Sequence, residues 1–452
     1  MRSRYVVAAT ALAAVLLGVS VGRLWASPAP PPDGARDVAT TATRGGTPSP
    51  TVPAASTAGS TSAATSATSA SSTTTAPATT TPGASPTGDR PLAVSVSGNR
   101  LVDASGAPVR LLGVNRSGTQ YACAEGWGVF DGPSDQASVA AIASWGVTAV
   151  RVSLNEQCWL GVNGLPAAMT AAAYRQAVAT YVDLLNRAGM YVVLDLHWNA
   201  AGSARATDQQ PMADRDHAPA FWAGVAAQFK DHPAVLFDLY NEPYPDDNRD
   251  TDAAWHCVRD GGSCPGVDFT AAGSQEMLDA VRGTGATNVV LVGGPQYAGS
   301  LTRWTEFRPH DPAEQLAASV HIYYNTPHDP EWSPCWAGDC WARTIEPLTS
   351  TTPVVIGEVG EHDCASGLLM PLLKWADAHD LSYLAWSWIT GDCAKEPALV
   401  SRYDGTPSGA GAGYRAHLLE LTARRAADAT TANAQRAPHP SSHPTPHPTP
   451  GG

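Results

Sequence analysis

The chain has 452 residues and a formal net charge of −13, from 41 acidic and 28 basic residues. A surplus of negative charge on this scale repels polyanions, which argues against nucleic acid or an acidic polymer as the main partner. A neutral substrate fits this composition better.

The first 90 residues form two segments, and neither has the composition of a folded core. In residues 1–26, Arg2 and Arg4 precede a long apolar run and then small residues, as in a secretory signal peptide. The run is long for a signal peptide, so an uncleaved membrane anchor is the alternative. Residues 27–90 are rich in Ser, Thr, Pro and Ala and lack large apolar residues, which predicts a disordered linker. In both cases we expect the rest of the chain to be exported: secreted, or held outside the membrane by the anchor.

Residues 91–425 are the predicted folded domain, and their length suits a single α/β barrel with insertions. Residues 426–452 end in a Pro-, His- and Thr-rich stretch, and we expect a disordered tail there. The histidines of this tail could bind metal, but a solvated tail is the favoured interpretation.

Within the domain, alternating polar and apolar residues over 92–109 predict a short β-hairpin. Strand and helix patterns then alternate to the end of the domain. The predicted strands are 111–114, 148–154, 191–196, 235–240, 289–292, 319–324, 354–358 and 383–388. Helical patterns cover 136–145, 170–189, 221–229, 271–281, 369–376 and 414–421. This order predicts a (β/α)8 TIM barrel, whose active site lies at the C-terminal ends of the strands.

Two of these strands end in a glutamate. The fourth runs into Asn241-Glu242-Pro243, and the seventh ends at Glu358. Glutamate is rarely buried without a partner, so an acid that closes a core strand needs a reason. A parallel barrel brings both carboxyl groups to one pocket, which is what glycoside hydrolysis requires.

Other polar residues fall at the same strand ends. Arg151 lies on the second strand and His197 closes the third, while His321 and Tyr323 share one face of the sixth. Structural alternatives exist: Arg151 in a salt bridge, His197 as a brace and His321 bonded to a backbone carbonyl. The two histidines lack neighbouring acidic residues at the usual spacing for a metal site, so we expect no metal and no cofactor.

This series resembles glycoside hydrolase family 5, the cellulase family, over about residues 92–421. It comprises Arg151, His197-Trp198, Asn241-Glu242-Pro243, His321-x-Tyr323, Glu358 and Trp388. The resemblance implies a retaining mechanism with Glu242 as acid/base and Glu358 as nucleophile. It further implies that Asn241 binds the sugar 2-hydroxyl.

The remaining expectations at this face concern support and stacking. Arg151 would keep the nucleophile ionised and the Tyr323 hydroxyl would orient it. His197 either binds a sugar hydroxyl or braces the pocket. Trp388 is the expected stacking platform for the reactive sugar, and Trp386 is expected in the core.

Cysteines and loop tryptophans complete the set of candidates. An even number of cysteines in an exported chain favours disulfides over metal ligation, and no CxxC pair is present. The expected pairs are Cys257–Cys264, Cys335–Cys340, Cys123–Cys158 and Cys364–Cys393. Tryptophans in predicted loops favour an extended binding cleft, with packing on nearby disulfides as the alternative. They are Trp127, Trp159, Trp332, Trp336 and Trp341.

The leading hypothesis is a secreted, monomeric, retaining endo-β-glycanase that acts on a neutral β-linked polysaccharide or oligosaccharide, above all β-1,4-glucan. A β-mannanase or an exo-β-glycosidase would use the same residues for catalysis. A carbohydrate-binding barrel without catalysis is the alternative from another class, and retention of both Glu242 and Glu358 argues against it.

Overall fold

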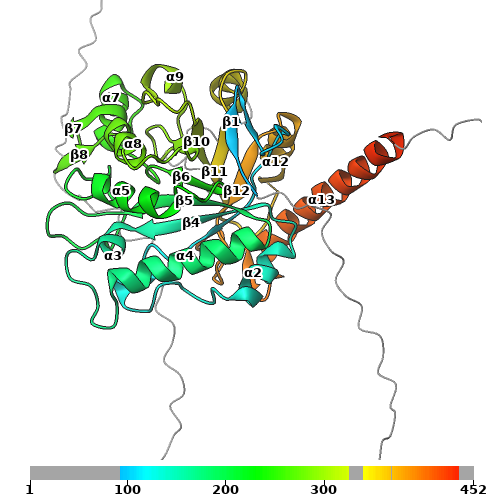
Figure 1. Ribbon diagram of the computed structural model, residues 1–452, viewed down its shortest axis with the longest axis horizontal. Helices are drawn as coiled ribbons and strands as arrows, with labels where there is room; N and C mark the ends of the chain where they lie inside the picture. The colour runs from blue at the N-terminus through cyan, green and yellow to red at the C-terminus, as the bar shows by residue number, and fades with distance from the viewer. Residues whose placement is uncertain (1–91, 325–339, 368, 437–452) are drawn as a thin grey trace, which may run out of the picture. The chain divides into compact units, whose positions relative to one another are not determined.

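The computed structural model describes residues 92–324, 340–367 and 369–436. Eight parallel strands close into a barrel in the order β3, β4, β5, β6, β9, β10, β11, β12, and β12 pairs back with β3 (Figure 1). They are β3 Leu112–Arg116, β4 Ala149–Asn155, β5 Tyr191–Trp198, β6 Val235–Asp238, β9 Val290–Val292, β10 Leu316–Tyr324, β11 Val354–Glu361 and β12 Ser382–Ala385. The predicted (β/α)8 TIM barrel is therefore confirmed, including all eight strands.

Helices follow the strands along the chain and pack on the outside of the barrel (Figure 1). The longer ones are α2 Gln136–Ala143, α4 Ala171–Arg187, α5 Ala218–Phe229, α7 Asp252–Asp260, α8 Ser274–Arg282, α12 Leu369–Ala378 and α13 Gly409–Arg436. Shorter ones are α1 Ala122–Glu125, α3 Glu156–Leu160, α6 Pro245–Asn248, α9 Trp304–Phe307, α11 Glu346–Thr349 and the π-helix η2 Trp341–Ile345.

Helix α4 shows how the sequence specifies these elements. The hydroxyl of Thr170 accepts a hydrogen bond from the backbone N–H of Ala173 at 3.1 Å and so caps the helix. Apolar residues at helical spacing form its buried stripe, which includes Tyr174, Val178 and Leu185. The stripe packs against the barrel, as the periodicity predicts.

The predicted N-terminal hairpin closes the floor of the barrel. It consists of β1 Ser95–Ser97 and β2 Arg100–Val102, which pair antiparallel. The backbone N–H of Val94 donates to the carbonyl of Pro233 at 2.9 Å, just before β6 begins. Val94 and Leu101 pack against apolar residues inside the barrel. A site is therefore expected at the opposite end, where the strands finish.

Three disulfides fix loops on the C-terminal side of the barrel strands. The predicted pairs Cys123–Cys158, Cys257–Cys264 and Cys364–Cys393 are all present. The expected Cys335–Cys340 pair lies outside the described residues because Cys335 does. Two small hairpins occur in the same loops: β7 Gly261–Ser263 with β8 Thr270–Ala272, and β13 Val400–Arg402 with β14 Thr406–Pro407.

The closing helix is longer than expected. Helix α13 continues to Arg436, so placing the start of a disordered tail at residue 426 is wrong. Residues 422–428 are exposed, so the sequence has no buried apolar stripe there that would indicate a helix. This stretch is rich in alanine, the strongest helix former, and alanine favours a helix without needing burial.

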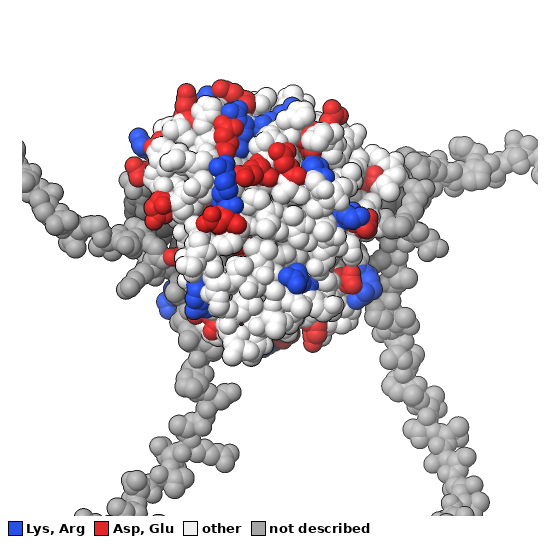
Figure 2. Space-filling model, turned by 60° about the vertical axis from the view of Figure 1, so that its left-hand side comes forward, with Lys and Arg blue, Asp and Glu red and all other residues white. Residues whose placement is uncertain are grey.

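The outer surface of α7, α8 and α9 carries acidic and basic side chains next to each other. This side of the molecule faces forward in Figure 2, where blue and red groups adjoin rather than forming a patch of one sign. Ion pairs join Arg215 to Glu276 at 2.8 Å and Arg259 to Asp260 at 2.7 Å. Within the described ranges no helix is long and apolar enough to cross a membrane.

Candidate active site

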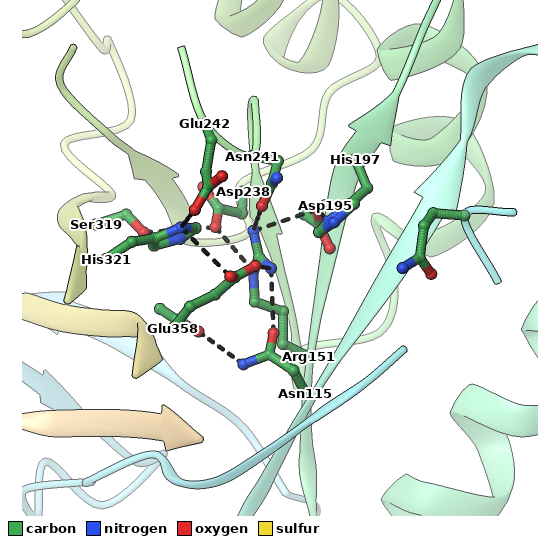
Figure 3. Close-up of polar contacts among 12 residues, drawn as sticks. Asn115, Arg151, Asp195, His197, Asp238, Asn241, Glu242, Ser319, His321 and Glu358 are labelled. Atoms are coloured by element: carbon green, nitrogen blue, oxygen red, sulfur yellow. Dashed lines mark hydrogen bonds and ion pairs between the residues drawn. The ribbon is translucent and has the colours of Figure 1, made fainter. Parts of the chain in front are cut away.

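Glu242 and Glu358 meet at the C-terminal end of the barrel. Glu242 lies just beyond β6 and Glu358 lies in β11, and both side chains point toward His321 of β10 (Figure 3). One carboxyl oxygen of each glutamate and one ring nitrogen of His321 all lie within 4.8 Å of one another. The His321 Nδ1 is 2.9 Å from the Glu242 Oε1 and 3.7 Å from the Glu358 Oε2. The two glutamates that the sequence singled out therefore share one pocket.

Glu358 is held on both carboxyl oxygens. The Arg151 Nη1 donates to its Oε1 at 2.6 Å, and the Tyr323 hydroxyl donates to its Oε2 at 2.5 Å. Both donors are on neighbouring or facing barrel strands, so their positions are set by the sheet. Glu358 is buried, and these two contacts fix the direction in which its carboxylate points.

Arg151 is buried beneath the site and contacts further carboxylates that the sequence analysis did not identify. Its Nη2 lies 3.2 Å from the Asp195 Oδ2, and its Nε lies 3.1 Å from the Asp238 Oδ2. Burial disfavours the guanidinium charge, but Asp195, Asp238 and Glu358 outweigh it and raise the pKa of Arg151. Arg151 therefore carries a positive charge under the pocket. The salt-bridge alternative for Arg151 and its expected contact with Glu358 are thus both present.

Asp195 and Asp238 could have been recognised from the sequence. Each interrupts a strand of large apolar residues, and an acid in such a strand needs a buried partner. Burial raises the pKa of Asp238 to about 7, and the nearby Arg151 limits the rise. Asn115 of β3 was also missed; its amide oxygen accepts from the Arg151 Nη1 at 3.1 Å.

His197 is braced from below and from the side. Its Nδ1 lies 2.7 Å from the Asp195 Oδ2, and its ring stacks on Trp386 with 5.3 Å between centroids and 9° between planes. These contacts match the bracing role that the sequence left open. They also fix the ring, so its free edge keeps one orientation.

The structure corrects the expectation for one of the two tryptophans at the end of β12. Trp388 has 0% exposure and packs edge-on against Trp145 at 4.8 Å between centroids, so the expectation that it stacks on a sugar is wrong. Trp386 keeps 9% exposure and is the tryptophan that reaches the site, on His197. Strand β12 ends at Ala385, so the two-residue alternation used to orient these side chains does not extend to Trp388.

Glu242 has an environment that favours its protonated form. Its side chain is 15% exposed, and burial raises its pKa to about 7. A hydrogen bond from the Gln209 Nε2 to the Glu242 Oε2, 3.1 Å long, opposes this rise. Gln209 lies in the loop after β5, and nothing in its sequence context indicated this contact. Burial also lowers the pKa of His321 to about 3, so this imidazole is neutral.

Asn241 is oriented by its neighbours. The Arg151 Nη2 donates to its side-chain oxygen at 3.0 Å, and this contact fixes which side of the amide is the donor. The Asn241 Nδ2 reaches the Gln209 side-chain oxygen at 3.4 Å. An amide donor is therefore presented beside Glu242.

The strand-end histidines lack acidic residues at metal-site spacing along the chain, but the fold brings acidic side chains beside them. His197 contacts Asp195, and His321 lies between Glu242 and Glu358, a trio with the donor types of a metal site. The acids come from other strands, so spacing along the chain could not show them. Both oxygens of Glu358 accept hydrogen bonds, from Arg151 and from Tyr323.

The loop tryptophans divide into buried and exposed residues. Trp159 and Trp341 are buried, so the expectation that they line a cleft is wrong. Trp159 faces α5 from the short helix α3 and packs on Phe221 at 5.9 Å. Trp127 is 42% exposed and contacts Tyr121, which in turn contacts Trp198 beside the site. Trp332 and Trp336 lie outside the described residues.

One carboxyl oxygen of Glu242 lies within 4.8 Å of one of Glu358 at the C-terminal end of a (β/α)8 barrel, and the pKa of Glu242 is raised to about 7. This arrangement is typical of the glycoside hydrolases that retain anomeric configuration. The family model of the cellulases of glycosyl hydrolase family 5 matches residues 102–392, more than half of the chain. The protein belongs to this family.

Relatives of this chain include two bacterial endoglucanases. An endoglucanase of Bacillus sp. (strain KSM-635) is 26% identical over 231 residues, which are 49% of this chain and 21% of that protein. Endoglucanase A of Butyrivibrio fibrisolvens is 24% identical over 247 residues, 53% of this chain and 47% of that protein. The chain thus spans about half or less of the length of these relatives.

Solved structures agree on the fold. A β-glucanase of Saccharophagus degradans in complex with cellotetraose has a TM-score of 0.55 at 19% identity, covering 74% of this chain and 94% of that one. A hyperthermophilic endocellulase of Pyrococcus horikoshii has a TM-score of 0.56 at 20% identity, covering 73% and 98%. At such identities the likeness supports the barrel and says nothing of substrate.

Proposed function

We propose that the protein is an exported endo-β-glucanase that hydrolyses β-1,4-linked glucan with retention of configuration. The observation that carries this proposal is that one carboxyl oxygen of Glu242 lies within 4.8 Å of one carboxyl oxygen of Glu358. Retaining enzymes hold their two carboxyl groups about 5 Å apart, whereas inverting enzymes leave room for a water between them, at about 6.5–9.5 Å.

The proposed reaction has two steps. In the first, a carboxylate oxygen of Glu358 bonds to the anomeric carbon while the proton of Glu242 moves to the departing glycosidic oxygen. In the second, the Glu242 carboxylate takes a proton from water, whose oxygen bonds to the anomeric carbon and releases Glu358. Both residues then return to their starting states.

The surrounding residues fit these roles. Arg151 and Tyr323 aim the Glu358 carboxylate, and burial supplies Glu242 with a proton near neutral pH. The Asn241 amide donor stands where it would bond a sugar 2-hydroxyl, a contact that strengthens in the transition state. Trp386 replaces Trp388 as the aromatic side chain that would face the sugar.

Export belongs to the same proposal. Disulfides form in oxidising compartments, so the three described ones support a signal or anchor function for residues 1–26. A neutral glucan agrees with the net charge of −13. The exposed Trp127 supports binding of a chain longer than one sugar, and so endo action.

The test is reducing-sugar release by the purified protein from soluble cellulose, mixed-linkage β-glucan and β-mannan. We expect cleavage of the glucans, a β-configured first product by NMR, and a loss of about 10³-fold or more in Glu358→Gln. In Glu358→Ala, azide should restore turnover of an aryl β-glycoside and give the α-glycosyl azide. In Glu242→Ala it should give the β-azide. Cleavage of mannan alone would show that β-mannan, and not β-1,4-glucan, is the substrate. A first product with inverted configuration would refute the retaining mechanism.

A further inference from the structure

A second cluster of ionisable side chains lies outside the pair Glu242 and Glu358. Glu156 is the first residue of α3, directly after β4, and it is buried. Asp214, also buried, and the partly buried His217 come from the segment that leads into α5. The cluster therefore joins two successive loops on the C-terminal side of the barrel.

The three side chains converge on one point. One donor atom from each lies within 4.8 Å of the other two. The His217 Nδ1 is 3.2 Å from the Asp214 Oδ1 and 3.8 Å from the Glu156 Oε2. Zinc ligands at about 2.0–2.2 Å in a tetrahedron stand roughly 3.3 Å apart, so only a small contraction would complete such a site.

The two carboxyl groups of the cluster have little positive charge beside them. Two buried carboxyl groups face each other, and the ion pairs that they form within the described ranges involve His217 alone. Asp216 adds a further negative charge close by, on the outer side. Two carboxyl groups held this close in a buried place share either a proton or a cation between them.

One acceptor of the cluster is also unused. The Glu156 Oε1 is buried and has no hydrogen-bond partner in the described parts of the chain, while the Oε2 accepts from the Ala200 N–H at 3.3 Å. The carboxylate of Asp214 is oriented by the Asn199 side chain at 2.9 Å and by the His217 N–H at 2.9 Å. The structure thus holds both acids in place, and the buried Glu156 Oε1 keeps acceptor capacity that the described residues do not use.

We propose that Glu156, Asp214 and His217 bind a divalent cation of the zinc type. Carboxylate oxygens together with an imidazole nitrogen suit Zn²⁺, whereas Ca²⁺ and Mg²⁺ prefer oxygen ligands only. Without the metal, the His217 Nδ1 makes a 3.1 Å contact with the Ala200 carbonyl. With it, the Nδ1 is the ligand and the ring proton moves to the Nε2.

The bound ion would link the start of α3 to the loop between β5 and α5. The same loop includes Asn199, whose side-chain oxygen accepts from the Tyr240 hydroxyl at 3.0 Å. A metal that holds Asp214 and Glu156 together therefore stabilises a loop that covers the barrel beside β6. Its removal should lower the thermal stability of the protein.

The experiment uses the full chain with the tail histidines His439, His443 and His447 replaced by Ala, so that zinc cannot bind at the tail. This parent protein is stripped with chelator and dialysed against Zn²⁺, and its metal content and melting temperature are measured. We expect one zinc per chain and a rise of about 3 °C at saturation, which chelator reverses. Glu156→Gln and Asp214→Asn in this parent should lose both.

A control variant is Glu276→Gln, which removes an exposed acid paired with Arg215 and should keep the full zinc response. The proposal is overturned if the parent binds no zinc, or if Glu156→Gln binds it equally well, since the ion would then sit elsewhere. If the parent binds no zinc, Glu156 and Asp214 share a proton instead, and Glu156→Gln is at least as stable as the parent above neutral pH. Circular dichroism checks that each variant is folded. If Glu156→Gln does not fold, the zinc content of Asp214→Asn decides the question.

Discussion

Gln209 offers a direct test of how the pocket sets the proton of Glu242. Its amide donates to the Glu242 Oε2 at 3.1 Å and to the Glu242 backbone carbonyl at 3.2 Å. The first contact stabilises the ionised carboxylate and so lowers its pKa. Gln209→Leu removes both hydrogen bonds and leaves the side-chain volume nearly unchanged. We expect the pKa of Glu242 to rise further above its usual range.

The size of the effect follows from the geometry. A hydrogen bond to a buried charged group contributes about 1.5–3 kcal/mol. Because Glu242 is 15% exposed and the amide is shared with a carbonyl, about 1 kcal/mol is reasonable here. At 1.36 kcal/mol per unit, this corresponds to a pKa higher by about 0.7. The loss of the contact with Asn241 should also lower kcat by about 3–10-fold.

The assay is kcat/KM against pH for an aryl β-cellobioside. The acid must be protonated, so activity falls as pH rises through the pKa of Glu242, about 7 in the native protein. In Gln209→Leu this alkaline limb should move up by about 0.7 pH unit. Gln210→Ala is the matched control, because the Gln210 side chain contacts only a backbone carbonyl at 3.5 Å. A limb that stays in place, or moves down, would refute the reasoning.

Three further predictions concern stability and the pocket wall. Trp388→Ala should cost about 3–5 kcal/mol in urea unfolding, whereas Trp386→Ala should reduce kcat/KM on cello-oligosaccharides more than stability; equal stability losses would contradict this assignment. Burial raises the pKa of Asp238 from an ordinary 3.8 to about 7 in the folded protein, so its ionisation lowers the free energy of unfolding as pH rises between these values. The free energy of unfolding should therefore fall by on the order of 2 kcal/mol less between pH 5 and pH 8 in Asp238→Asn than in the native protein. An equal fall in both proteins would contradict the raised pKa of Asp238. Replacing both Cys123 and Cys158 by Ala, which opens a loop with a sequence separation of 35, should lower the unfolding free energy by about 4 kcal/mol; a loss below about 1 kcal/mol in calorimetry would exclude this entropic account.

The amino-acid sequence by itself determined the barrel and its pair of glutamates. Strand and helix periodicities are local properties that the sequence shows directly. A parallel barrel places the C-terminal ends of its strands on one face, so the proximity of Glu242 and Glu358 could be predicted from the sequence. Arg151, His321 and Tyr323 were located for the same reason. The three described disulfides followed from the order and spacing of the cysteines.

Only the tertiary structure decided which side chains from distant segments touch. The contact of Gln209 with Glu242 depends on the path of a loop, and loop paths leave no periodic signal in the sequence. Trp386 rather than Trp388 contacts His197 because β12 ends before both, and strand ends are the least certain part of any pattern. The partners of Arg151 and the cluster around Glu156 likewise join residues from separate strands and loops. Burial and pKa depend on such contacts, so the chemistry of these groups is set by packing.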